Sequence, residues 1–393
     1  MVLTNGAQSN GHTNEYSRED WNDIQHTGPG TLAGRYMRMF WHPVAVADDL
    51  PAGETKPIRI MSENFTLYRG EGGTPHVLDF RCAHQGTQLS LGWVEEDSIR
   101  CFFHGWVFDQ TGQCVEQPGE PERPFCEKIR IRSYPTEEYL GLVFAYLGEG
   151  EPPPLPRYPD FEEEGILDVQ YYERECNYAQ DFEPKPIHGA FVHSDGPPFR
   201  RKSIPISVKA EETEWGFTTF AVHENGQVKA KPYGMPNVHH VKAPPDQWGS
   251  GWTDSLVHIV PIDDEHMRSF SVELTRLTGE AATAYLERRG GVNRGVRKFD
   301  HEVVKLILAG KLKLKDVDPD SIDMTWLEDD IAYVGQGAIS DRSKEHLGPS
   351  DAGNICMRSI WARELRALAE GRPLIQWRRT VGAAGVVATD GVR

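Results

Sequence analysis

Two short motifs, each with one cysteine and one histidine, constrain this chain more than any other feature. They read Cys82-Ala-His84 and Cys101-Phe-Phe-His104, and sixteen residues separate the first pair from the second. Thiolate and imidazole groups are preferred ligands of transition metals. Each pair is short enough to lie on one loop, and nearby glycines permit the tight turns that would bring two loops together. The motifs therefore predict a four-ligand metal centre between two loops.

The mixed composition of each pair distinguishes two kinds of centre. Zinc also takes two Cys and two His, but its sites typically pair Cys with Cys and His with His. A Rieske [2Fe–2S] cluster has thiolates on one iron and imidazoles on the other, and two mixed loops suit that arrangement. We therefore favour a Rieske cluster on Cys82, His84, Cys101 and His104 over zinc or coincidence, and expect the other four cysteines to be buried small hydrophobes.

Charge and hydropathy restrict the partners. The 393 residues include 42 Lys and Arg against 59 Asp and Glu, which gives a net charge of −17. A protein that binds nucleic acids or anionic membranes usually presents a basic surface to them. The sequence has no apolar run of membrane-spanning length, and its polar N-terminus lacks the apolar core of a signal peptide. We expect a cytoplasmic protein without a nucleic-acid or membrane partner.

Composition divides the chain into five segments. Residues 1–28 are rich in Asn, Ser, Gly and Thr and are expected to form a mobile arm. Residues 29–147 carry short apolar stretches between Gly and Pro, which is typical of a small all-β domain. Three consecutive prolines make residues 148–160 a linker. A second domain is expected at 161–372, and a loose tail at 373–393.

The second domain mixes two periodicities. Residues 208–222 and 255–274 alternate like strands, whereas 281–289, 296–309 and 354–370 have helical spacing. The pattern predicts an α+β domain after the all-β one.

A Rieske cluster moves one electron at a time, so a second centre should receive it. His188 and His193 are five residues apart, which is about 140° around an ideal helix. Gly189 lets a helix end or distort between them. Two His and one carboxylate on one face of an open octahedron form the triad of non-haem Fe(II) oxygenases. Two incidental histidines are the alternative.

The run CAHQGTQLSLG…CFFHGWVFDQTGQC resembles the Rieske domain of the Rieske non-haem iron oxygenases. Ala83 and Gln85 stand where many members carry Pro and Arg, and neither position is a ligand. Residues 28–46, 260–267 and 326–351 resemble the phthalate dioxygenase and aromatic O-demethylase branch, of the dehydrodivanillate O-demethylase type.

This resemblance spans residues 28–372 and implies the third iron ligand. In this branch an acid seven positions before the Gln of a Gln-Gly pair holds the iron, which corresponds to Asp329, with Asp330 as the neighbouring alternative. It also implies a Rieske [2Fe–2S] β-sandwich domain followed by a helix-grip (START-like) catalytic domain with an antiparallel sheet. The implied assembly is a head-to-tail homotrimer or a dimer of trimers.

One position departs from the family pattern. The family carries an Asp three residues before the first His ligand, where it couples the centres of neighbouring subunits, and Lys185 stands there in this chain. Prolines at 184 and 186 favour extended geometry for the residues before them, so a helix is expected to start at Pro186. Glu183 is the preferred substitute for the missing acid, and Asp181 is the alternative.

The activity implied is that of a Rieske monooxygenase of aromatic catabolism. It would use O₂ to hydroxylate or O-demethylate an aromatic substrate that is carboxylated or methoxylated. NAD(P)H would supply electrons through a ferredoxin or flavin reductase to the [2Fe–2S] cluster and then to mononuclear Fe(II). Arene dihydroxylation and N-demethylation are alternatives within this enzyme class. A Rieske electron-transfer or binding protein with a degenerate mononuclear site is the alternative outside it.

Overall fold

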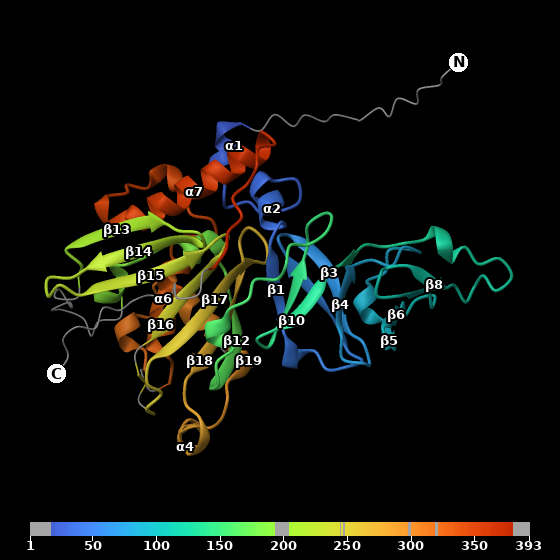
Figure 1. Ribbon diagram of the computed structural model, residues 1–393, viewed down its shortest axis with the longest axis horizontal. Helices are drawn as coiled ribbons and strands as arrows, with labels where there is room; N and C mark the ends of the chain where they lie inside the picture. Colours follow the sequence, from blue (N-terminus) through green and yellow to red (C-terminus); the bar gives the residue numbers. More distant parts are fainter. Residues whose placement is uncertain are drawn as a thin grey trace.

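Two sheet-rich parts lie side by side in the computed structural model (Figure 1). It describes residues 17–192 and 204–379, except 244, 247, 298–299 and 319–320. In this described part of the chain, no helix is long and apolar enough to cross a membrane. The mixture of mainly antiparallel sheets with helices agrees with the α+β prediction.

The N-terminal part is built from three small antiparallel sheets. The first has the order β1 (Trp41–Val46), β11 (Leu142–Tyr146), β10 (Thr136–Tyr139). The second has the order β2 (Thr55–Ile60), β3 (Glu63–Arg69), β4 (Pro75–Asp79), β9 (Ser133–Tyr134). The third has the order β5 (Trp93–Glu95), β6 (Ser98–Arg100), β7 (Val107–Phe108), β8 (Cys114–Glu116) and lies at the end of the molecule far from the second part (Figure 1).

The second part contains one large sheet of eight strands. Its order is β13 (Ser207–Glu212), β14 (Gly216–Val222), β15 (Val228–Gly234), β16 (Val238–Ala243), β17 (Thr253–Pro261), β18 (Met267–Thr275), β12 (Ile166–Arg174), β19 (Arg294–Val296). Only the β12–β19 pair is parallel. Residues 208–222 and 255–274, expected as strands, are each a hairpin.

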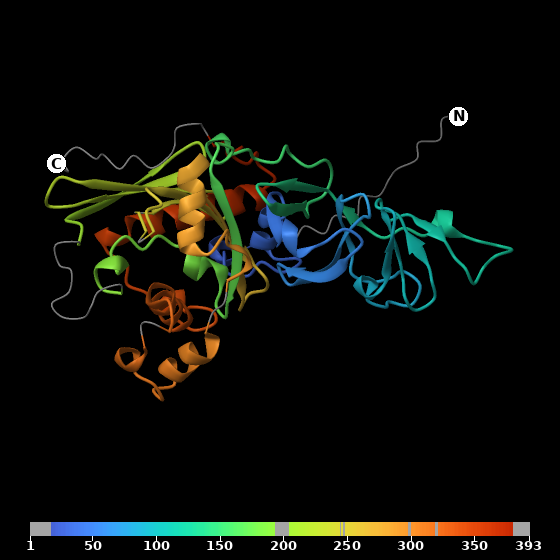
Figure 2. The ribbon, with the colours of Figure 1, turned by 90° about the horizontal axis from the view of Figure 1, so that it is seen from below.

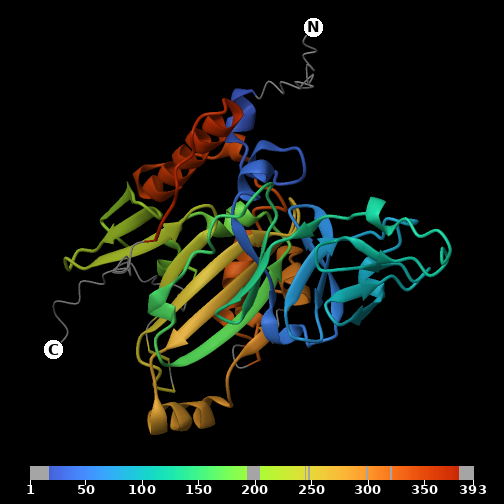
Figure 3. The ribbon, with the colours of Figure 1, turned by 45° about the vertical axis from the view of Figure 1, so that its right-hand side comes forward.

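Helices surround this sheet. Two of them, α3 (Tyr178–Phe182) and α7 (Ala352–Ala369), pack against its strands, and α7 also contacts α1 (Arg18–Asn22) (Figure 3). The segment of α5 (His301–Leu308) and α6 (Met324–Val334) lies below the sheet in Figure 2. The remaining helices are α2 (Leu32–Met37) and α4 (Gly279–Arg289).

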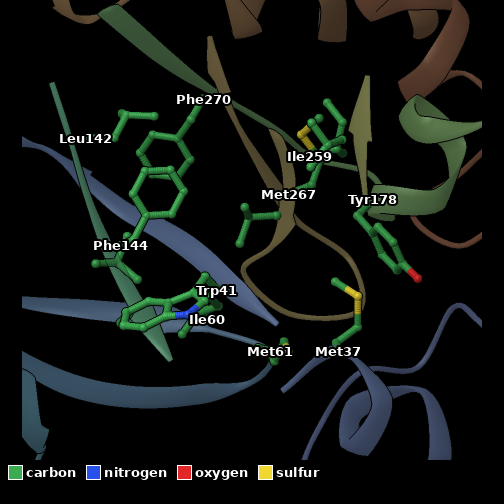
Figure 4. Packing of buried hydrophobic residues seen from close by; sticks show 14 of the residues in the cluster. Met37, Trp41, Ile60, Met61, Leu142, Phe144, Tyr178, Ile259, Met267 and Phe270 are labelled. Carbon is green, nitrogen blue, oxygen red and sulfur yellow. The ribbon is translucent and has the colours of Figure 1, made fainter. Parts of the chain in front are cut away.

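A continuous apolar core joins the two parts. Trp41 and Phe144 from the first part and Ile259 and Phe270 from the second belong to one buried cluster, which Figure 4 shows from close by, and all four side chains are less than one-tenth exposed. Backbone bonds also cross the boundary, since the Met61 amide donates to the Pro261 carbonyl oxygen at 2.8 Å. The two parts are therefore packed into one body.

Three segments differ from the sequence expectations. Ile24, placed in a mobile arm, is 2 % exposed, and its carbonyl oxygen accepts a hydrogen bond from Tyr178 at 2.7 Å. Trp377, placed in a loose tail, donates its indole hydrogen to the Tyr36 hydroxyl at 2.9 Å. The helix expected from 296 starts at His301, because the Asp300 side chain caps it by accepting from the Val303 amide.

Candidate metal centres

The two Cys–His loops have the same backbone conformation, and each is closed by one backbone hydrogen bond. Cys82 and Cys101 are each 2 % exposed. Their carbonyl oxygens accept hydrogen bonds of 3.0 Å from the amides of Gly86 and Gly105 respectively. Both glycines have a positive φ, 76° and 74°, which other residues adopt only with strain. The chain thus presents its two ligand loops in matching conformations.

The two imidazoles, one from each loop, lie edge to face. The ring centroids of His84 and His104 are 4.6 Å apart. The ring of His84 stacks on the indole of Trp106, with centroids 4.5 Å apart and an angle of 8° between the planes. Nδ1 of His84 is buried and has no hydrogen-bond partner in the described structure. Since an unsatisfied buried nitrogen is costly, this atom suits a metal ligand.

The two thiols share this buried environment. The pKa of Cys82 is raised to about 11, chiefly by burial, while the neighbouring Cys101 thiol also raises it and backbone hydrogen bonds lower it. Two adjacent buried thiols lose their protons readily only when a cation is bound between them. The four residues therefore fit a cluster with two thiolate and two imidazole ligands.

Large apolar side chains surround the ligand loops at the surface. Trp93, Phe102 and Phe103 are 58, 45 and 54 % exposed, and Leu91 is 56 % exposed. Exposed apolar residues that adjoin one another often mark an interaction surface. The predicted cluster therefore lies beneath an apolar tip of the molecule.

A second candidate centre joins two segments that are distant in sequence. His188 begins a single 3₁₀ turn, His188–Ala190, just beyond α3, and Asp329 lies on α6. Nε2 of His188 is 3.7 Å from Oδ1 of Asp329. Nδ1 of His188 donates to the carbonyl oxygen of Lys185 at 2.5 Å. That bond places a hydrogen on Nδ1 and leaves Nε2, on the Asp329 side, as the ring nitrogen available to a metal.

The local structure here differs from the expectation of a helix starting at Pro186. Residues 186 and 187 form a turn, and up to residue 192, where the described segment ends, the 3₁₀ turn of His188–Ala190 is the one helical turn that follows. The position before this turn, Ile187, offers no side-chain cap, and Pro186 has no amide hydrogen to donate. His193 lies outside the described residues.

The neighbouring carboxylates Asp329 and Asp330 have different surroundings. Asp330 is 3 % exposed and accepts a hydrogen bond of 2.5 Å from Nε of Arg174. Burial raises the pKa of Asp330 to about 6, although Arg174 acts in the opposite direction. Adjacent residues on a helix point about 100° apart, so Asp329 faces His188 while Asp330 is held by Arg174. Within the described residues, no three His, Cys, Asp or Glu side chains already converge on one point.

Lys185 turns away from this pair. Its ammonium donates to the carbonyl oxygens of Gln180 and Glu183, the latter at 3.0 Å. It also lies 4.4 Å from the centroid of the Tyr333 ring. Burial lowers the pKa of Lys185, and the carboxylates of Glu183 and Asp181 oppose that effect. The cation at the position of the family's coupling acid thus bonds to the end of α3.

The two acids considered as substitutes are both engaged in ion pairs. Glu183 is 8 % exposed and accepts from Arg342 at 2.8 Å and from Arg358 at 2.6 Å. Asp181 accepts from Arg174, which also holds Asp330. Glu183 therefore links the α3 segment to the C-terminal helix α7, which carries Arg358.

Several residues near the second centre were not anticipated from the sequence. Arg174 is 2 % exposed at the end of β12, and Lys231 lies on β15, whose Tyr233 contacts Phe182 of α3. The only available signal was the alternation along β15, which puts Lys231 on the same face as the buried Tyr233. A hollow of about 720 Å³ elsewhere, lined by residues such as Arg132 and Tyr134, contains none of the predicted ligands.

Comparison with known proteins extends over most of the chain. Residues 40–135 match the family model of the Rieske [2Fe-2S] domain. The 5,5'-dehydrodivanillate O-demethylase oxygenase subunit of Sphingobium sp. (strain NBRC 103272 / SYK-6) is 30 % identical, over 90 % of this chain and 82 % of that protein. The tert-butanol monooxygenase / tert-amyl alcohol desaturase oxygenase subunit of Aquincola tertiaricarbonis is 36 % identical, over 86 % of this chain and 75 % of that protein.

Solved structures show the same fold. The QL mutant of NdmA from Pseudomonas putida CBB5, determined with theobromine, superposes with a TM-score of 0.62 at 18 % identity, over 91 % of this chain and 98 % of that chain. The N-terminal part is thus a Rieske [2Fe–2S] domain, and all four predicted cluster ligands fall within its matched range. The chain belongs to the Rieske non-haem iron oxygenases, among their oxygenase (alpha) subunits. The predicted family, fold class and enzyme class are confirmed.

Proposed function

We propose that this oxygenase hydroxylates or O-demethylates an aromatic substrate that carries a methoxy or carboxyl group. It takes electrons singly from NAD(P)H through a separate ferredoxin or flavin reductase. The observation that carries the proposal is the approach of His188 Nε2 to Asp329 Oδ1 at 3.7 Å, in a chain that also has a Rieske domain. An electron-transfer protein would have no need for that second pair.

The residues fit two centres. Cys82, His84, Cys101 and His104 would hold the [2Fe–2S] cluster. His188, His193 and Asp329 would hold mononuclear Fe(II), which leaves coordination positions open and supplies the activation of O₂ when bound. The chain's own contribution is orientation: the Lys185 carbonyl oxygen fixes the His188 ring, and Arg174 anchors the helix that carries Asp329 through its neighbour Asp330.

The reaction balances with one O₂, two electrons and two protons. For a methoxyarene, ArOCH₃ + O₂ + 2e⁻ + 2H⁺ gives ArOH + HCHO + H₂O. Hydroxylation of the methoxy carbon gives a hemiacetal, which then releases formaldehyde and the phenol. Support for an aromatic ether or acid as substrate comes from the names of two relatives, the 5,5'-dehydrodivanillate O-demethylase oxygenase subunit above and a phenoxybenzoate dioxygenase alpha subunit of Ectopseudomonas oleovorans, which is 30 % identical over 87 % of this chain and 84 % of that protein.

A second candidate is hydroxylation of a tertiary alcohol. Its support is the 36 % identity to the relative named as a tert-butanol monooxygenase. The two candidates predict different products from the same protein preparation, so one substrate panel separates them.

The assembly we propose is a head-to-tail homotrimer, alone or as a dimer of trimers. In it the apolar tip around Phe102 and Phe103 would pack against the catalytic part of the next subunit, with Glu183 or Asp181 between the two centres. The exposure of those rings supports this arrangement. A structure of carbazole 1,9a-dioxygenase, described as an oxygenase and ferredoxin complex, has the same fold at a TM-score of 0.61 and 18 % identity, which suits a ferredoxin partner here.

Turnover with a supplied reductase tests the proposal. Protein loaded with both centres is mixed with a ferredoxin, its reductase, NADH and one substrate from a panel of methoxybenzoates, neutral methoxyarenes and tert-butanol. We expect equimolar phenol and formaldehyde from a methoxyarene, with O₂ uptake above the reductase background. Absence of product and O₂ uptake across the panel, with both centres loaded, would favour the electron-transfer alternative.

A further inference from the structure

Lys231 is a cation on the inner face of the large sheet. It lies on β15 opposite Thr219 of β14, two residues before Tyr233. Residues two apart in a strand share a face, and its ammonium is 5.2 Å from the centroid of the Tyr233 ring. Tyr233 is 2 % exposed and contacts Phe182 of α3, with ring centroids 5.9 Å apart. Lys231 therefore points to the side of the sheet that α3 covers.

This side of the sheet also holds the second candidate centre. The charged groups that act on the Lys231 ammonium are Asp181, Lys185 and Asp329. Asp181 is paired with Arg174, and Asp329 lies beside His188. Among the residues that the structure describes, no carboxylate lies within ion-pair distance of Lys231. Burial lowers the pKa of Lys231 to about 8, which agrees with a cation that lacks a close counter-ion.

Among the described residues nearest the centre, the charges balance before any metal is added. The carboxylates are Asp181, Asp329 and Asp330, and the cations are Arg174, Lys185 and Lys231. Glu183, which also acts on Lys185, is paired with the cations Arg342 and Arg358. A divalent ion on the proposed ligands would leave the region positively charged. Lys231 is half-buried. A partly desolvated ammonium without a close counter-ion is costly, so an anionic ligand is favoured beside it.

We propose that Lys231 binds the carboxylate of an aromatic acid substrate and selects such acids over neutral aromatic compounds. This inference deepens the proposed function and rests on it. A lysine ammonium is a compact point charge that pairs with a single carboxylate without demanding bidentate geometry. From β15 it would hold the acid end of the ring while the other end faces Asp329 and His188.

Binding of a matched acid and amide tests the subsite. Calorimetry on the metal-loaded protein compares 4-methoxybenzoate with 4-methoxybenzamide, which has nearly the same shape and no charge. We expect the wild type to bind the acid more tightly. Lys231→Met should weaken acid binding roughly 10- to 100-fold and leave amide binding within about threefold.

Two further variants separate charge from folding. Lys229 lies on the same strand with its side chain exposed, so Lys229→Met should change neither affinity. Lys231→Arg keeps the charge and should retain part of the preference for the acid. A wild type that binds the acid no better than the amide, or that binds neither, would overturn the proposal. Equal weakening of both ligands in Lys231→Met would overturn it too.

The outcomes also separate this subsite from the proposed function. Acid binding that depends on Lys231, without turnover of any panel compound, would support the subsite and contradict the oxygenase activity proposed above. Turnover of methoxyarenes with no preference for acids, unchanged in Lys231→Met, would support the activity and contradict the subsite.

Discussion

Nε2 of His188 lies 3.7 Å from Oδ1 of Asp329, although the two residues are far apart in the sequence. His188 follows the short helix α3, and Asp329 lies on α6. The Lys185 carbonyl oxygen fixes the ring by accepting from Nδ1. A histidine oriented in this way places Nε2 beside a carboxylate, and these are two of the three ligands of the non-haem iron triad.

Asp329 and Asp330 should respond differently to the same substitution. Asp329→Asn is expected to lower the iron content by about one atom per chain, because it removes a mononuclear ligand. Asp330→Asn should keep that iron and lower the free energy of unfolding by about 2 kcal/mol, because it weakens a buried bond to Arg174. Metal analysis and urea unfolding of both variants check this. Iron loss in Asp330→Asn alone would assign the ligand role to Asp330 instead.

Substitution should distinguish the cysteines that hold the Rieske cluster from the other cysteines of the domain. Cys101→Ser is expected to abolish the cluster, with loss of its visible absorption, its reduced-state electron paramagnetic resonance signal and its acid-labile sulfide. Cys114 is also buried in this domain at 2 % exposure but is outside the two motifs, so Cys114→Ser is the matched control and should keep all three. A cluster that survives Cys101→Ser would refute the assignment.

Glu183 should affect both stability and electron transfer. Glu183→Gln removes the charge that pairs with Arg342 and Arg358, so we expect a loss of about 2 kcal/mol in the free energy of unfolding. If Glu183 also couples the centres, rapid mixing with O₂ should show slower oxidation of the reduced cluster. Glu345→Gln, which loses one pairing with Arg358, is the control. Unchanged iron content with unchanged turnover in Glu183→Gln would dispose of the coupling role.

His258 should make stability sensitive to mild acid. It is 3 % exposed, and burial lowers its pKa to about 3. The unfolded chain takes up this proton near pH 6.5 and the folded chain does not. The contribution of His258 to the free energy of unfolding is therefore fully present above that pH and falls as the pH drops below it. Between pH 7.5 and 6.0 this group should account for roughly 0.8 kcal/mol of the fall.

The control for that prediction is His258→Phe, whose ring can occupy the aromatic contacts with Phe144 and Tyr158. Urea unfolding at the two pH values should show a smaller fall in the variant. The smaller fall that remains in the variant should include the contribution of His42, whose pKa is lowered to about 4 by burial. An equal fall in both proteins would show that His258 is not responsible.

The features predicted best from the sequence are those whose parts are neighbours in the chain. The Cys82 and Cys101 motifs each lie within a few residues, and the matched Rieske domain contains both. Alternating stretches identified strands, but the turn at Thr213–Gly216 was missed, although a polar run at 211–214 and Gly216 interrupt the alternation of 208–222. The paired residues of that hairpin are therefore in β13 and β14 rather than in one strand.

Features that depend on tertiary neighbours could not be predicted from the residues alone. The surroundings of Asp330 depend on Arg174, which comes from β12. The direction of Lys185 depends on the Tyr333 ring of α6. The isolation of Lys231 depends on which acids the other elements bring near it. Proximity of this kind depends on the packing of whole elements and leaves no local pattern.

The central claim is that one chain holds a Rieske cluster and a mononuclear iron, and metal analysis tests it most directly. Iron, zinc and acid-labile sulfide are measured per chain on protein purified without oxygen. The account predicts about three irons and two sulfides per chain, with no zinc. About two irons and two sulfides would contradict the mononuclear centre, and zinc without sulfide would contradict the whole account.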